Sequence, residues 1–306
     1  MKWQNLISWV SALILLGLLI TYFILFFFPY SIDFSFKEVN NNFSITAEGS
    51  TSMQFYPNMR FPTSTITYSI DKVGCTVKKI ADMKRAFSSI QDQTSLSFIE
   101  LPENGAITIV CESTTRVEEG LYIAGEGGPS NVTQTGLFNV ISKGNILLIR
   151  EDRCQTPSIA IHELLHVLGF DHSTNKNNIM YPVTNCKQTI GQDALDLINE
   201  LYKTPSYPDL AIQNASASFT GNYFTSNVQI INQGLSLANN STLIIYGDDK
   251  EIKRVDIEEL DYGYGRIISF ERLLTSKRYD KVEYDIEYNG NEISKENNKA
   301  ILIIKK

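Results

Sequence analysis

The sequence predicts an α+β domain over residues 53–204, followed by an all-β sandwich over residues 205–306. Two observations predict this order. Stretches with apolar residues at helical spacing lie among strand-like stretches in the first region, whereas after Pro208 the helical spacing gives way to alternation of period two. A third observation adds a segment before both domains, because the N-terminus begins with a long apolar run.

That apolar run extends from Ile7 to Phe28 without a charged residue. As a helix rising about 1.5 Å per residue it would cross the roughly 30 Å hydrocarbon core of a bilayer. It ends in three phenylalanines and Pro29-Tyr30, with no small-residue cleavage pattern. We therefore expect a retained transmembrane signal-anchor in residues 1–30. A cleaved signal peptide and a buried soluble helix are the alternatives.

The flanking charges predict the orientation of this anchor. Lys2 precedes the apolar run, whereas Asp33 follows it before Lys37. The positive-inside bias then places the N-terminus in the cytoplasm and the rest of a single-pass membrane protein outside. Residues 31–52, polar and rich in Asn and Ser, are expected to be a tether.

Cysteine usage and charge are consistent with an exported domain. The four cysteines form no C-x-x-C pair, so an extracellular domain could oxidise them to two disulfides, the alternative being buried thiols: Cys75, Cys111, Cys154 and Cys186. Five sequons fit an exported surface, at Asn42, Asn131, Asn214, Asn239 and Asn240. A net charge of −7 argues against nucleic acid as a partner.

The elements of the first domain follow in chain order. Thr65–Ile70 is β-branched and aromatic, which predicts a strand. Apolar residues at helical spacing from Ala81 to Ile90 predict an amphipathic helix. The remaining expected elements are strands over 106–111 and 145–149, a loop over the glycine-rich residues 120–128, and helices over 158–168 and 193–202.

The second domain is marked by strict alternation. In Lys281–Tyr288 every second residue is apolar and the others are charged, as in a strand with one face in water. Further strands are expected over 228–231, 243–246 and 300–304. Turn residues separate these stretches, and about seven short strands in such a length indicate a β-sandwich of the immunoglobulin-like kind.

The central segment carries a candidate zinc site. His162 and His166 are four residues apart, so on a helix both imidazoles point to the same side. Gly169 can take the left-handed conformation that ends a helix and turns the chain back, which would bring His172 to the same point. The chain has only 3 histidines, and all of them occupy these positions. Three imidazoles leave one position of a tetrahedral zinc ion open for water.

Glu163 is the candidate catalytic residue of this site. It is adjacent to the first predicted ligand, where a general base for a zinc-bound water is needed. The alternative is a glutamate that is merely solvated on a helix face. The residue types and their spacing together predict hydrolysis by an activated water.

The full pattern from His162 to His172, H-E-x-x-H-x-x-G-x-x-H, resembles that of the metzincin peptidases. The resemblance is greatest to the matrixins, because Ser173 follows the third histidine and a Met180-Tyr-Pro segment follows at the expected distance. It covers about residues 60–204. It implies a catalytic domain with a mixed sheet and three helices, Met180 beneath the metal, and a polypeptide substrate.

The chain also departs from the matrixin pattern. No histidine remains for the second, structural zinc of that family, so we expect one catalytic Zn²⁺, and calcium binding stays undecided. No cysteine-switch propeptide precedes residue 60. Disulfides could replace the missing metals, with Cys154–Cys186 bracketing the zinc segment and Cys75–Cys111 tying the first helix to a strand. This is one of about three possible connectivities.

The C-terminal region resembles the CARDB-type modules of prokaryotic surface proteins. Pro208-Asp-Leu-Ala-Ile212, an Asn-Gln-Gly ending at Gly234, and Glu296-Asn-Asn298 carry this resemblance. It implies either a module that binds a surface partner or a plain spacer.

Two functions of different classes follow from these observations. The first is a membrane-anchored, extracytoplasmic zinc metalloendopeptidase with Glu163 as general base. The alternative is a zinc-containing surface adhesion protein without peptidase activity. Its zinc site would need a fourth protein ligand, for which Cys186 is the candidate.

Overall fold

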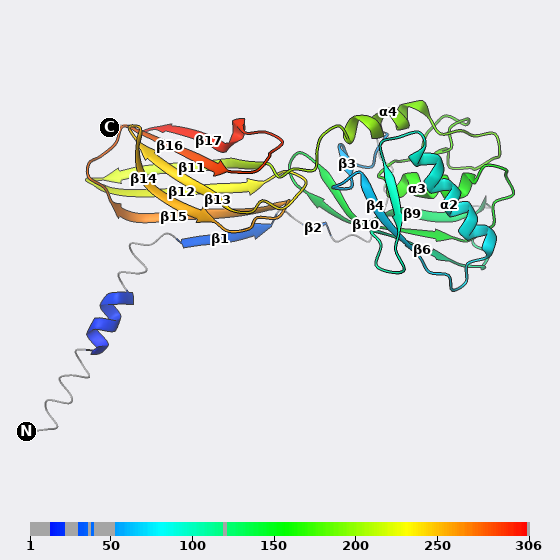
Figure 1. Ribbon diagram of the computed structural model, residues 1–306, viewed down its shortest axis with the longest axis horizontal. Coiled ribbons are helices and arrows are strands. Elements are labelled where there is room, and N and C mark those ends of the chain that lie inside the picture. Colours follow the sequence, from blue (N-terminus) through cyan, green and yellow to red (C-terminus); the bar gives the residue numbers. More distant parts are fainter. Residues whose placement is uncertain (1–12, 22–29, 36–37, 40–52, 119–120, 305–306) are drawn as a thin grey trace, which may run out of the picture. The chain divides into compact units, whose positions relative to one another are not determined.

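The computed structural model describes residues 13–21, 30–35, 38–39, 53–118 and 121–304 (Figure 1). The chain divides into two compact units. One unit contains residues 36–208 and 233–236, and the other contains residues up to 35 together with 209–232 and 237–306. Each unit has its own hydrophobic core.

The first unit is built on a mixed sheet. Seven strands form it: β2 (Glu38–Val39), β3 (Met59–Arg60), β4 (Thr65–Ile70), β5 (Ser97–Glu100), β6 (Ile107–Cys111), β9 (Gly125–Gln134) and β10 (Asn139–Leu148). Their order is β2-β9-β10-β6-β4-β5, and β3 pairs with β10. Strand β9 is antiparallel to β10, whereas β10, β6, β4 and β5 run parallel. The expected mixed sheet is therefore present.

Three helices complete this unit, as the matrixin resemblance implied. They are α2 (Val77–Gln91), α3 (Ser158–Val167) and α4 (Gln192–Leu201). Helix α2 begins four residues before the predicted start, because the Thr76 side chain accepts a hydrogen bond from Lys79 N and caps the helix there. Helix α3 packs against α2, β9 and β10.

The glycine-rich stretch is not the loop that the sequence predicted. Residues from Gly125 onward form the long strand β9, preceded by a small hairpin of β7 (Val117–Glu118) and β8 (Leu121–Tyr122). The glycines are there because the strand lies directly against α3. A Cβ at Gly127 would lie 2.3 Å from the main-chain oxygen of Glu163. Close packing, rather than turn formation, explains this composition.

Both expected disulfides are present. Cys75–Cys111 joins the start of α2 to the end of β6. Cys154–Cys186 joins the segment before α3 to the segment before α4. No cysteine is free.

The second unit is a sandwich of two four-stranded sheets (Figure 1). One sheet has the order β1-β15-β12-β11, and the other has the order β14-β13-β16-β17. The strands are β1 (Tyr30–Ser35), β11 (Leu210–Thr220), β12 (Tyr223–Asn232), β13 (Ser241–Gly247), β14 (Lys250–Ile257), β15 (Tyr264–Leu274), β16 (Lys281–Tyr288) and β17 (Lys299–Ile303). A short 3-10 helix, η1 (Glu296–Asn298), precedes β17. The expected all-β domain is present.

The predicted tether is partly regular structure. Strand β1 pairs antiparallel with β15, from Tyr30 opposite Ser269 to Ser35 opposite Tyr264. Strand β2 pairs with β9 at the edge of the other sheet. The remainder of the predicted tether, residues 36–37 and 40–52, lies outside the described residues.

The predicted membrane anchor can be followed only in part. Residues 13–21 form a helix with exposed side chains, whereas the rest of the apolar run lies outside the described residues. Within the described ranges, no helix has both the length and the apolar character needed to cross a membrane. The anchor therefore stays a prediction.

Candidate metal centre

Helix α3 carries the first two predicted zinc ligands on one side. His162 and His166 are one turn apart and are 6% and 5% exposed. Every residue of the helix except Ile159 is buried, and the helix packs against β9, β10 and α2. These two imidazoles are therefore held in a rigid part of the core.

The turn after α3 brings the third histidine to them. Gly169 has φ +96°, a left-handed conformation that L side chains rarely adopt, and its N–H bonds the carbonyl of His166. The His166 Nε2 atom lies 3.0 Å from His162 Nε2 and 3.2 Å from His172 Nε2. Within the part of the chain that the structure describes, this is the one cluster of potential metal-ligating groups.

Main-chain carbonyls fix which ring nitrogens face one another. His162 Nδ1 lies 2.7 Å from the oxygen of Ile179, and His166 Nδ1 lies 2.8 Å from the oxygen of Phe170. A carbonyl only accepts, so each Nδ1 must carry the proton and each neutral Nε2 presents a lone pair. Two lone pairs about 3 Å apart repel unless a cation lies between them. The arrangement fits a bound zinc ion.

The surroundings keep these imidazoles neutral. Burial lowers the pKa of His162 to about 4, with the hydrogen bond that its ring donates to the Ile179 carbonyl opposing the shift and His172 adding to it. Burial, and then the neighbouring His162 and His172, lower the pKa of His166 to about 3. Burial also lowers the pKa of the more exposed His172, while Asp171 raises it. Neutral imidazole is the form that binds metal.

Glu163 follows the first ligand and faces strand β9. Its side chain is buried, and burial raises its pKa to about 8, with a smaller contribution from Glu126. A Cβ at Gly125 would lie 3.0 Å from the Glu163 Oε1 atom. The carboxyl group thus lies directly beside the main chain of β9, and a side chain at residue 125 would have to displace it.

Met180 lies in a tight turn next to the site and is 3% exposed. The Asn178 side chain accepts a hydrogen bond from Met180 N, and Tyr181 N donates to the carbonyl of Asn178. The carbonyl of Met180 accepts from Ser173 N, so the turn is tied to the segment that carries His172. A cavity of about 270 Å³ adjoins this turn, lined among others by His172, Met180 and Asp193.

The structure brings His162, His166 and His172 together as the spacing predicted. It excludes Cys186 as a fourth ligand, because this residue is bonded to Cys154. Sequence reasoning missed the carbonyls of Phe170 and Ile179, which any residue type could supply. It also missed the role of Gly125 and Gly127. Their spacing of two, which places both on one face of a strand, could have indicated it.

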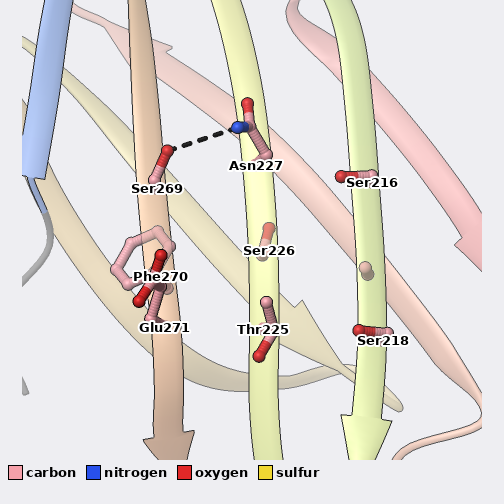
Figure 2. Close-up of a pocket in the computed structure, with 9 residues that line it drawn as sticks. Ser216, Ser218, Thr225, Ser226, Asn227, Ser269, Phe270 and Glu271 are labelled. Carbon is pink, nitrogen blue, oxygen red and sulfur yellow. Dashed lines mark hydrogen bonds between the residues drawn. The ribbon is translucent and has the colours of Figure 1, made fainter. Parts of the chain in front are cut away.

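A second hollow, in the sandwich, lacks such chemistry. It lies over strands β11, β12 and β15 and is lined mainly by small hydroxyl and amide side chains (Figure 2). Asn227 donates to Ser269 Oγ there at 3.3 Å. Glu271 is its only ionisable lining residue. This hollow therefore carries no argument for catalysis.

Two histidines on a buried helix, a third after a glycine turn, and a methionine turn beside them are the features that define the class of zinc metallopeptidases. Residues 60–203 match the family model Matrixin, and residues 207–301 match the family model CARDB. The chain thus contains a matrixin domain followed by a CARDB domain. The match to the Matrixin model supports a function of the zinc-dependent metallopeptidase kind, that is, a hydrolase.

Two solved structures resemble part of the chain. One is a domain of a Methanosarcina acetivorans protein, at 17% identity, covering 33% of this chain and 94% of that chain with a TM-score of 0.27. The other is the CARDB domain of a Pyrococcus furiosus protein, determined in complex with di-metal ions. It is 14% identical, covers 32% of this chain and 90% of that chain, and has a TM-score of 0.28. No curated protein sequence matches the chain.

Proposed function

We propose that this protein is a zinc metalloendopeptidase in which His162, His166 and His172 hold one Zn²⁺ and Glu163 is the general base. The observation that carries the proposal is the convergence of three Nε2 atoms, two of which, on His162 and His166, belong to rings whose proton is fixed on Nδ1 by a main-chain carbonyl. Zinc at such a site lowers the pKa of its water and polarises a substrate carbonyl.

Glu163 performs the proton transfers in this proposal. Its carboxylate accepts a proton as water attacks the scissile carbonyl carbon, and then passes that proton to the leaving amide nitrogen. Burial favours the protonated form of Glu163, whereas the charge of a bound cation favours the carboxylate. The two effects bring its pKa toward the neutral range in which both transfers are possible.

The edge of β9 supports an extended polypeptide as the substrate. On the edge away from β10, β9 pairs with β2 only at Val132 and Thr133 among the described residues. A peptide can add to the free part of this edge as a further strand through main-chain hydrogen bonds. Because Gly125 and Gly127 place one face of this strand against Glu163, a peptide paired along its edge would pass close to the base.

Replacing Glu163 with Gln tests this function. We expect the variant to keep its zinc but to lose about 10²–10⁴-fold in rate on a peptide library. The measurement combines cleavage profiling with metal analysis of the same sample. Equal cleavage by both proteins, or no zinc in the purified wild type, would contradict the proposal.

The alternative function is that of an adhesion protein with a purely structural zinc. The Cys154–Cys186 disulfide argues against this alternative, because it removes the candidate fourth ligand. A structural zinc is normally closed by four protein ligands. The described residues offer three imidazoles and no free thiol at the site. The CARDB domain can still bind a surface partner alongside a catalytic role.

We also infer an extracytoplasmic location with an N-terminal membrane anchor. The uncharged run Ile7–Phe28 and two disulfides support this inference, because disulfides persist in oxidising compartments. Protease added to intact cells should degrade the catalytic domain, and fractionation should find the intact chain in the membrane. Protection from the protease, or recovery of a soluble shortened chain, would contradict it.

A further inference from the structure

The segment Met53–Phe55 lies along the turn that carries the third histidine. Phe55 N donates to the carbonyl of Gly169 at 3.0 Å, and Asp171 N donates to the carbonyl of Met53 at 3.0 Å. Between these bonds, Gln54 forms an antiparallel bridge with Phe170. We call Met53–Phe55 the strap. Its three residues pair with Gly169, Phe170 and Asp171, and the two main-chain hydrogen bonds lie at the two ends of this pairing.

The strap also contacts a metal ligand through a side chain. The ring of Phe55 stacks on the imidazole of His166, with centroids 5.7 Å apart and planes inclined by 19°. The carbonyl of Phe170, which orients His166, belongs to the residue bridged by Gln54. Ring stacking and carbonyl placement therefore both depend on the same three residues.

Buried contacts fix the strap itself. Gln54 is 3% exposed, and its amide donates to the carbonyl of Met59 at 2.7 Å and accepts from Met59 N at 3.2 Å. The side chain of Met59 fills the space at Gly169, where a Cβ would lie 2.6 Å from its Cγ. Because Met59 belongs to β3, the strap ties the ligand turn to the sheet.

We propose that Phe55 is a positioning residue for His166, and that the strap sets metal affinity by holding His166 and His172 at their mutual distance. This inference rests on the proposed zinc site. The strap precedes residue 60, where the Matrixin match begins, so the matched segment does not include it. The metal centre of this chain then depends on residues outside its recognisable catalytic sequence.

The test compares zinc affinity in full-length variants by chelator competition. Phe55→Leu should weaken binding on the order of ten-fold, the usual effect of losing an outer contact to a metal ligand. The matched control is Phe98→Leu, because Phe98 contacts Phe87 at 4.8 Å in the same domain. This control should stay within about two-fold of wild type, as should Phe55→Tyr, which keeps the stacked ring.

Cobalt substitution separates positioning from general packing. The d–d absorption of bound Co²⁺ reports ligand geometry, so it should change in Phe55→Leu and not in Phe98→Leu. Gln54→Met, which removes both bonds to Met59, should weaken zinc binding in the same direction and serves if Phe55→Leu does not fold. The inference is wrong if the Phe55 and Phe98 variants bind zinc equally. Wild type that binds no zinc overturns the proposed function and this inference together.

Discussion

Two main-chain carbonyls determine which ring nitrogen of each buried histidine carries the proton and which one is free to bind a metal. The spacing of His162, His166 and His172 predicted which residues meet. It could not predict that Ile179 and Phe170 fix the ring protons, because a carbonyl leaves no signature in the sequence. Residue types thus specify the ligands, whereas the surrounding turns specify the donor atoms.

Tyr284 gives a residue-scale prediction about pH. It is fully buried in the sandwich, bonded to Ser226 Oγ at 2.7 Å and to the carbonyl of Ser216, and burial raises its pKa to about 12. The unfolded tyrosine ionises near pH 10, so this group's contribution to stability is complete below pH 10 and is lost as pH rises toward 12. The loss is about 2–3 kcal/mol in all.

Urea denaturation from pH 9 to 11.5 measures this effect. The free energy of unfolding of the CARDB domain should fall more steeply with pH in wild type than in Tyr284→Phe. Parallel curves for the two proteins would show that Tyr284 ionises normally in the folded state.

At the scale of elements, the contact between β9 and α3 gives a second prediction. Gly127→Ala places a Cβ 2.3 Å from the main-chain oxygen of Glu163 and should destabilise the matrixin domain by about 1–3 kcal/mol. The neighbouring Gly128→Ala is the control, because no atom lies within 4 Å of its Cβ position. Thermal unfolding measures both variants, and equal melting temperatures would contradict the proposed close contact.

The disulfides form a matched pair for a third prediction. Cys154–Cys186 and Cys75–Cys111 close loops with sequence separations of 32 and 36, so replacing either pair with Ser should cost a similar ~4 kcal/mol. Only the first brackets α3 and the Met180 turn. Its loss should therefore reduce peptide cleavage well beyond the loss from the second pair, measured below both melting temperatures. Equal activities would show that the bridge near the site has no special role.

The sequence patterns predicted helix α3 but missed strand β9, and the difference has a physical reason. The core face of α3 is visible in the spacing of its own residues, and so is its end at Gly169. Strand β9 was missed because Gly125 and Gly127 are poor strand formers, and their presence is explained only by a helix more than thirty residues later. Spacing within a segment predicts the element that the segment forms, whereas a contact between segments distant in sequence is known only from the structure.

At the scale of the molecule, the matrixin domain is inserted, in the order of the chain, between two parts of the sandwich domain. Strand β1 precedes that domain in the chain but pairs with β15, which follows it. The sequence predicted a tether here. A short edge strand has little pattern of its own, because it is ordered by pairing with a strand far along the chain. The CARDB match at residues 207–301 is thus one strand short of the complete sheet.

Removing β1 is the fourth prediction. Deleting Tyr30–Ser35 should lower the melting temperature of the CARDB domain and uncover the edge of β15, which can pair with a second copy. Calorimetry and light scattering measure the two effects. A deletion of equal length within residues 43–48 is the control, and identical behaviour of the two deletions would contradict a stabilising role of β1.

The confinement of all 3 histidines to one site has a practical consequence for spectroscopy. Every imidazole proton signal of this protein arises from the candidate metal centre, with no background from other histidines. Nuclear magnetic resonance of histidine-labelled protein would therefore follow metal loading, ring protonation and substrate arrival directly, without any engineered probe.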